Sequence, residues 1–276
     1  MKICFIGGGN MASALIGGLL NRGFASAHIH VVDINAENCV RLHNEYGVRA
    51  SADLATSMTH CEVVVLAVKP QQLQELSKQL APMLSGKLII SVAAGIRAKD
   101  LSRWLNSDNV VRAMPNTPAL IRSGITGLYA LPAVSAAHRH DAQSVMAAVG
   151  STLWLESETM MDAVTAVSGS GPAYIFYFIE AMQQAAMELG FNQHDARRLA
   201  LDTFMGATKL ADAGNDDASV LRARVTSKNG TTECALLSME SNHVKQHIIN
   251  AVKAAAARSE EMGAELGGTS KGEVKS

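Results

Sequence analysis

Short runs of β-branched residues alternate with longer helical patterns through residues 1–156, and this alternation constrains the fold more than any other feature of the chain. Apolar runs of about four to eight residues are typical of strands that are buried on both faces of a sheet. Apolar side chains spaced by three and four residues indicate helices between them. We therefore predict an α/β domain with a mostly parallel sheet and crossover helices.

The two element types can be placed by their residue ranges. Strands are predicted at 2–6, 29–33, 62–67, 88–92, 110–113, 125–129 and 152–156, and helices at 10–21, 36–45, 71–81, 99–105 and 135–149. After residue 156 the strand pattern stops, and the chain becomes rich in Ala, Met and Leu, with Gly190, Gly214 and Gly230 as expected helix ends or turns. We predict a first domain over 1–156, an all-α second domain over 157–266 and a frayed tail over 267–276.

The composition argues against several classes of protein. Lys and Arg total 24 against 25 acidic residues, so no basic surface for nucleic acid is expected. No apolar run reaches the roughly 18 residues that a membrane span requires, and the N-terminus has no signal-peptide pattern. The four cysteines lie far apart in the sequence, which argues against a disulfide framework or a thiolate zinc site. We expect a cytoplasmic protein with no membrane attachment.

A glycine motif, GGGNMA at residues 7–12, follows the first predicted strand and opens the first helix. It matches the G-x-G-x-x-G/A pattern of dinucleotide-binding Rossmann domains in the context that the pattern requires. Gly7 permits a tight turn, Gly9 lets the backbone approach a pyrophosphate, and Ala12 lets the helix lie close to the sheet. The alternative is a glycine turn that binds no ligand.

Asp33 ends the second predicted strand, where an acidic side chain can accept hydrogen bonds from the adenosine ribose. By that rule NADH is favoured over NADPH, because a 2′-phosphate would meet a carboxylate. The alternative is that Asp33 caps the helix that begins near Ala36.

Three further segments follow strand ends, where ligands bind in open α/β sheets. AVKP at 67–70 would lie at the cofactor edge, although Pro70 also suits the first position of a helix. SVAAG at 91–95 offers small side chains against which a ring can lie. MPNTP at 114–118 forms a rigid turn that presents the Asn116 amide, with simple loop rigidity as the alternative.

Together with VSGSGPAY at 167–174 and VTSKNGTT at 225–232, these segments resemble pyrroline-5-carboxylate reductase from residue 2 to about residue 266. The resemblance implies reduction of the cyclic imine 1-pyrroline-5-carboxylate to proline with NADPH or NADH, the last step of proline biosynthesis. It also implies a homodimer formed through the helical domain, often assembled further into decamers.

The resemblance assigns roles position by position. It implies dinucleotide contacts from Ile6, Gly7, Gly8, Gly9, Asn10, Met11, Ala67, Val68, Lys69 and Pro70, and positions beside the nicotinamide for Ala93, Ala94, Gly95 and Asn116. It implies substrate contacts from Ser227, Gly230, Thr231 and Thr232. The chain departs from the family where Lys228-Asn229 replaces a usual Pro-Gly, and where Asn215 replaces a common Glu.

The candidate substrate segment suits an imine better than a carbonyl. A carbonyl acceptor normally requires an acid such as His or Lys, and Lys228 is the one conventional acid in this segment. A protonated imine is already an electrophile, so a hydroxyl is enough to orient its nitrogen. We nominate Thr232 for that role, with main-chain amides near Gly230 and Thr231 for the substrate carboxylate. Helix capping is the alternative role for both threonines.

Two other functions are the alternatives to this one. In β-hydroxyacid dehydrogenases a catalytic Lys follows a similar glycine-rich segment, but here Gly171-Pro172 is followed by AYIFY without a Lys. A non-catalytic dinucleotide-binding module would be consistent with the departures at 215 and 228–229. No metal is expected, since His243 and His247 lie one helical turn apart without a third ligand nearby.

Overall fold

The computed structural model describes residues 1–268, which form two compact units. The first unit contains Met1–Ser170 and the chain from Ala255 onward, and the second contains Gly171–Ala254. The last helix, α12 (Val244–Leu266), begins in the second unit and ends in the first. Residues 269–276 of the predicted tail lie outside the described residues.

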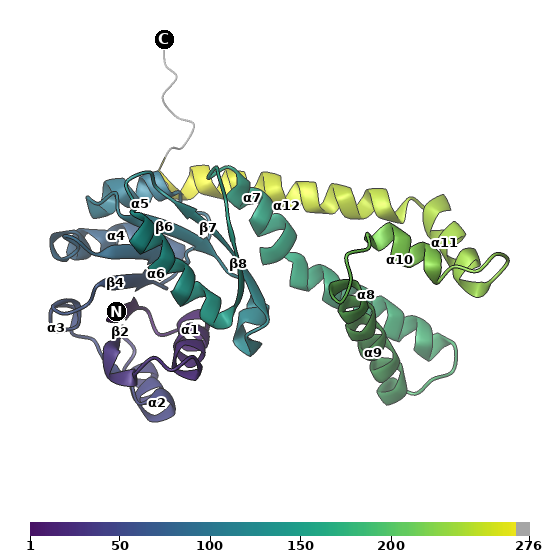
Figure 1. The fold of residues 1–276 in the computed structure, drawn as a ribbon, viewed down its shortest axis with the longest axis horizontal. Coiled ribbons are helices and arrows are strands. Elements are labelled where there is room, and N and C mark those ends of the chain that lie inside the picture. The colour runs from purple at the N-terminus through teal and green to yellow at the C-terminus, as the bar shows by residue number, and fades with distance from the viewer. Residues whose placement is uncertain (269–276) are drawn as a thin grey trace, which may run out of the picture. The chain divides into compact units, whose positions relative to one another are not determined.

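A β-sheet forms the centre of the first unit (Figure 1). It has eight strands in the order β3-β2-β1-β4-β5-β6-β7-β8. Neighbouring strands are parallel except β6 and β7, which are antiparallel. The α/β class and the mostly parallel sheet are therefore confirmed. The strands are β1 (Ile3–Ile6), β2 (Ile29–Val32), β3 (Arg49–Ser51), β4 (Val63–Leu66), β5 (Leu88–Ser91), β6 (Val110–Met114), β7 (Gly124–Ala130) and β8 (Gly150–Trp154).

Helices cover both faces of this sheet because alternate strand residues point to opposite faces. Ile3 and Phe5 belong to one core cluster with side chains of α1, α2 and α6, whereas Cys4 and Ile6 belong to a second cluster with side chains of α3, α4 and α5. The helices are α1 (Asn10–Asn21), α2 (Ala36–Tyr46), α3 (Leu54–Met58), α4 (Pro70–Leu80), α5 (Ala98–Leu105) and α6 (Ala136–Met146). Short 3₁₀ turns are η1 (Ser26–His28), η2 (Ala81–Met83), η3 (Thr117–Ile121) and η4 (Ala147–Val149).

The first unit extends beyond the predicted boundary at residue 156. Helix α7 (Met160–Val164) packs so closely on β7 that a Cβ at Gly127 would lie 2.7 Å from Val164 Cγ1. A π-helical turn, η5 (Thr165–Gly169), follows directly. The end of α12 is also joined to this unit, because Ser259 donates a hydrogen bond of 2.7 Å to Asp162. Arg103 donates to the Gly267 carbonyl at 3.0 Å, so the first residue of the predicted tail is bound to α5.

The second unit is all helical and buries little of its own apolar surface. Helices α8 (Gly171–Glu188) and α9 (Gln193–Asp212) pack on each other, followed by α10 (Ala218–Arg224), α11 (Thr231–Ser241) and the start of α12. Within 171–254, all of which is described, Ala196 and Ala200 are the fully buried apolar residues, whereas Phe176 is 65% exposed and Tyr177 71%. In residues 1–268 no helix combines the length and apolar character needed to cross a membrane.

A buried ion pair joins the sheet to the segment that precedes α7. Arg112 on β6 is 4% exposed, and its Nη1 lies 3.1 Å from Glu158 Oε1. The same oxygen accepts a hydrogen bond from the Ala98 amide at the start of α5. Removing one partner of a buried pair leaves the other charge unpaired in a medium of low dielectric, which is strongly destabilising.

We predict that Glu158→Ala lowers the free energy of unfolding by about 3 kcal/mol, because Arg112 and the Ala98 amide both lose their acceptor. Urea denaturation followed by circular dichroism measures this change. The matched control is Glu156→Ala, which removes the same charge from an exposed position and is expected to cost less than about 0.5 kcal/mol. Equal losses in the two variants would contradict a stabilising role for the ion pair.

Candidate functional site

The candidate cofactor site lies where the strand order reverses. From β1 the chain continues to β2 and β3, which lie on one side of β1 in the sheet. It then returns to β4, which lies on the other side of β1. Beyond the carboxyl ends of β1 and β4 the chain continues into the glycine turn and into residues 67–70, respectively. In open α/β sheets the crevice at such a switch point is where ligands bind.

The glycine turn after β1 needs each glycine for a different reason. Gly7 has φ of +100°, and a Cβ there would lie 2.7 Å from the Ala67 carbonyl oxygen. A Cβ at Gly8 would meet Leu42 Cδ1 at 2.6 Å and Asp33 Oδ2 at 3.0 Å. A Cβ at Gly9 would meet no described heavy atom within 4 Å. Gly7 and Gly8 therefore serve backbone packing, whereas Gly9 leaves open space in front of α1.

The N-terminus of α1 opens onto that space. Gly9 is the N-cap residue, and within the described residues no side chain caps the first turn of this helix. The first amides of a helix point outward and carry a partial positive charge, which favours an anion such as a pyrophosphate. The open Gly9 position and the uncapped helix fit a dinucleotide. Ile6, Asn10 and Met11 border the turn, as predicted residues of the site.

Asp33 is tied directly to the glycine turn. Its Oδ2 accepts a hydrogen bond from the Gly8 amide at 2.7 Å and another from Asn38 Nδ2 at 3.3 Å, and its Oδ1 accepts from the Asn35 amide at 2.8 Å. The capping role that the sequence left open for Asp33 belongs to Asn35, whose Oδ1 accepts from the Glu37 and Asn38 amides. Asp33 therefore does not cap α2, and its hydrogen bond to the Gly8 amide holds the glycine turn in place.

Arg41 is a neighbour of the glycine turn that the sequence did not single out. Its Nη2 donates to the Gly8 carbonyl at 3.0 Å and to Ser13 Oγ at 3.1 Å. Its Nη1 forms an ion pair with Glu45 on the same helix at 3.3 Å. In the sequence, Arg41 is a basic residue on the helix that follows Asp33. A basic residue in such a helix by itself indicates only a surface charge.

The residues after β4 and β5 form the adjoining part of the edge. Lys69 is the exposed N-cap of α4 and Pro70 is its first residue, so Pro70 has the structural role considered for it. Gly95 has φ of +74°, and a Cβ there would lie 2.9 Å from Leu266 Cδ1. That side of Gly95 is therefore covered by the end of α12, while Ala93 is buried beside it.

Asn116 uses both ends of its amide within the first unit. Its Nδ2 donates to the Ser168 carbonyl at 3.1 Å, and its Oδ1 accepts from the Ile125 amide at 3.0 Å. It therefore joins η3 and β7 to the π-helical turn. Ser168 lies in a motif used for the family resemblance, but its pairing with Asn116 could not be read from two distant segments.

The predicted substrate residues belong to the second unit, around the start of α11. Gly230 is the N-cap of this helix and its amide donates to the Ser227 carbonyl at 3.0 Å. Within 227–233, all of which is described, the Glu233 carboxylate accepts a hydrogen bond from the Asn229 amide at 2.6 Å, and the Thr231 and Thr232 hydroxyls are not used for capping. Asn229 has φ of +58°, a left-handed conformation that Asn tolerates better than most residues. The departure from Gly at this position is therefore compatible with the turn.

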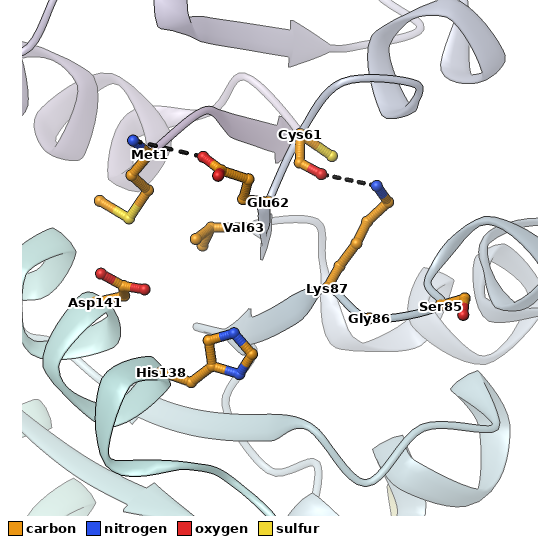
Figure 2. A pocket seen from close by; sticks show the side chains of 9 residues that line it. All are labelled: Met1, Cys61, Glu62, Val63, Ser85, Gly86, Lys87, His138 and Asp141. Carbon is orange, nitrogen blue, oxygen red and sulfur yellow. Dashed lines mark hydrogen bonds and ion pairs between the residues drawn. The ribbon is translucent and has the colours of Figure 1, made fainter.

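A different cavity, of about 430 Å³, lies at the amino ends of β4 and β5, and Figure 2 shows its lining. Glu62 pairs with the terminal ammonium of Met1 at 3.4 Å, and Lys87 Nζ donates to the Cys61 carbonyl at 2.7 Å. The hydrogen bond from the Lys2 amide, with the nearby ammonium, lowers the pKa of Glu62. Glu62 and Lys87 are thus each bound to a neighbouring group, at the end of the strands opposite to the glycine turn. Among residues 1–268 no three His, Cys, Asp or Glu side chains are grouped to hold a metal ion.

Known proteins match the chain over nearly its whole length. Residues 158–262 match the family model for pyrroline-5-carboxylate reductase dimerisation, and residues 2–95 match the model named NADP oxidoreductase coenzyme F420-dependent. The pyrroline-5-carboxylate reductase of Pseudomonas aeruginosa is 45% identical over 268 residues, which cover 96% of this chain and 98% of that protein. The chain belongs to the pyrroline-5-carboxylate reductase family.

Solved structures of the pyrroline-5-carboxylate reductase family have the same fold. The Coxiella burnetii reductase is 38% identical with a TM-score of 0.90, and the match covers 95% of this chain and 98% of that one. The Plasmodium falciparum reductase with NADP bound is 29% identical with a TM-score of 0.85 and the same coverage. The family resemblance and the fold inferred from the sequence are confirmed.

Substitutions in the glycine turn can distinguish an effect on stability from an effect on cofactor binding. We predict that Gly9→Ala leaves the melting temperature within about 2 °C of the parent protein, because its Cβ enters open space, but raises the cofactor Kd at least about tenfold. Gly7→Ala, by contrast, is expected to destabilise the fold, because its Cβ would overlap the Ala67 carbonyl. Thermal denaturation and titration with reduced nicotinamide cofactor measure the two effects. Unchanged cofactor affinity in Gly9→Ala would be evidence against pyrophosphate binding at this turn.

Proposed function

We propose that the chain transfers a hydride from NADH or NADPH to 1-pyrroline-5-carboxylate and forms L-proline, the last step of proline biosynthesis. The observation that carries this proposal is full-length membership of the reductase family, combined with an open glycine turn at the switch point of the sheet. The runner-up class, the β-hydroxyacid dehydrogenases, is disfavoured because no Lys follows Gly171-Pro172 closely.

The first unit supplies the cofactor site in this proposal. The amides at the start of α1 would hold the pyrophosphate, and Asp33 would accept hydrogen bonds from the adenosine ribose. Residues 67–70 would line the edge of the site, and Ala93, Ala94, Gly95 and Asn116 would flank the nicotinamide. The bound cofactor supplies the hydride, and the protein supplies position and electrostatics.

The second unit supplies the substrate residues. The reduction adds a hydride to the imine carbon and leaves a proton on the nitrogen, so a protonated imine needs orientation more than acid catalysis. Thr232 is half-buried and its hydroxyl is not used for capping, so we assign it to the imine nitrogen. The Thr231 amide and the amides that follow it, at the N-terminus of the 11-residue helix α11, would bind the substrate carboxylate. Gly230, whose amide is bound to the Ser227 carbonyl, and Ser227 itself would lie beside the carboxylate.

The second unit is also the proposed dimerisation surface. Large apolar side chains remain exposed on several of its helices, including Leu189 at 82% and Leu237 at 65%. Apolar surface of this extent marks an interaction site in a soluble protein. The dimerisation model of the family spans this unit, so we propose a homodimer through the helices, with assembly of dimers into a decamer as a further step. The four cysteines are free thiols, which fits a reducing compartment such as the cytoplasm.

The assay that tests the proposal follows oxidation of NADH and NADPH at 340 nm with 1-pyrroline-5-carboxylate as substrate. We predict turnover by the parent protein, and for Thr232→Ala a kcat roughly 10- to 100-fold lower with cofactor Kd changed by less than about twofold, because one oriented hydrogen bond is lost. Thr232→Ser is expected to retain most activity. The matched control is Thr208→Ala on α9, whose hydroxyl bonds the Phe204 carbonyl. A folded protein without turnover would refute the activity, and full activity in Thr232→Ala would remove that residue from the mechanism.

A further inference from the structure

We propose that Asp33 makes this reductase selective for NADH over NADPH, through a carboxylate that is held in place by the glycine turn and by the start of α2. The inference rests on the proposed function, because it concerns the cofactor of the same site. Membership of the family does not predict a preference for NADH, because the Plasmodium falciparum reductase structure has NADP bound. The choice therefore depends on residues of the individual chain.

The orientation of the Asp33 carboxylate is fixed by three donors. The Gly8 and Asn35 amides bind one oxygen each at 2.7 and 2.8 Å, and the Asn38 side chain adds a bond of 3.3 Å to the first of these oxygens. A carboxylate has about four acceptor positions, so Oδ1 retains capacity for a ribose hydroxyl. Because Gly8 is part of the pyrophosphate turn, this carboxylate and the cofactor backbone are positioned together.

The guanidinium near Asp33 is already bound to other groups, and the side chain next to Asp33 cannot bind a 2′-phosphate. The side chain that follows Asp33 is Ile34, which is 90% exposed and can cover an adenine ring but cannot bind a phosphate. Arg41 is the nearby guanidinium, and it is engaged by Glu45, Ser13 and the Gly8 carbonyl. Within the described residues Asp33 itself has no ion pair.

Charge and hydrogen bonding at Asp33 both favour NADH over NADPH. A 2′-phosphate carries close to two negative charges at neutral pH and would approach a fixed carboxylate. The free 2′-hydroxyl of NADH can instead donate a hydrogen bond to that carboxylate. We therefore expect a kcat/KM for NADH at least about tenfold higher than that for NADPH in the parent protein.

The test compares kcat/KM for the two cofactors in three variants. Asp33→Ser removes the charge and leaves room for the phosphate, so the NADH-to-NADPH ratio is expected to fall at least about tenfold, with the NADPH value rising. Asp33→Asn keeps the shape and an acceptor for the Gly8 amide, which preserves the turn, and is expected to shift the ratio in the same direction. The matched control is Glu37→Gln, which neutralises an exposed acid in the first turn of α2 and is expected to leave the ratio unchanged.

Direct binding separates this inference from the proposed function. The Kd of NADH and of NADPH is measured by fluorescence without substrate, so selectivity can be seen in a protein that does not reduce the imine. A binding preference for NADH that disappears in Asp33→Asn supports the inference even if turnover is absent. A parent protein that binds NADPH as well as or better than NADH overturns it. An equal shift in Glu37→Gln also overturns it, since the effect would then come from net charge alone.

Discussion

The close approach of the Gly7 backbone to the end of β4 is the constraint on which the cofactor end of this protein depends. Adjacent parallel strands place the glycine turn beside the Ala67 carbonyl, and only a residue without a Cβ can occupy Gly7 at its observed φ. The turn then directs α1 toward the open edge and brings the Gly8 amide to Asp33. The proposed cofactor site and the packing of the strands therefore depend on the same backbone geometry.

Much of the first unit could be predicted from the sequence because its signals are local. The helix expected at 10–21 has those bounds in the structure, and the strand at 29–33 differs by one residue. The strand β3 (Arg49–Ser51) and helix α3 were missed, since three residues with exposed ends and one short turn of helix have no readable periodicity. The antiparallel direction of β7 was not predicted either, because a pattern of burial does not specify strand direction.

The parts that sequence reasoning could not supply are those decided by tertiary contacts. The first unit reaches past residue 156 because α7 packs on Gly127 and Glu158 meets the buried Arg112. The bonds of Asn116 to Ser168 and of Arg41 to Gly8 join residues far apart in the chain. The roles assigned to Ser227, Gly230, Thr231 and Thr232 remain predictions based on the family and on the free hydroxyls at the start of α11.

Binding of a reduced nicotinamide cofactor at the glycine turn can be tested by amide hydrogen exchange with and without NADH. The full chain is compared in the two states, and peptides that cover residues 6–12 and 33–38 are expected to become protected when NADH is added, because the amides of α1 and the Asp33 loop would be ordered by the ligand. A peptide that covers residues 85–88, at the amino end of β5, is expected to exchange at the same rate in both states. Protection at 85–88 without protection at 6–12 would contradict cofactor binding at the glycine turn.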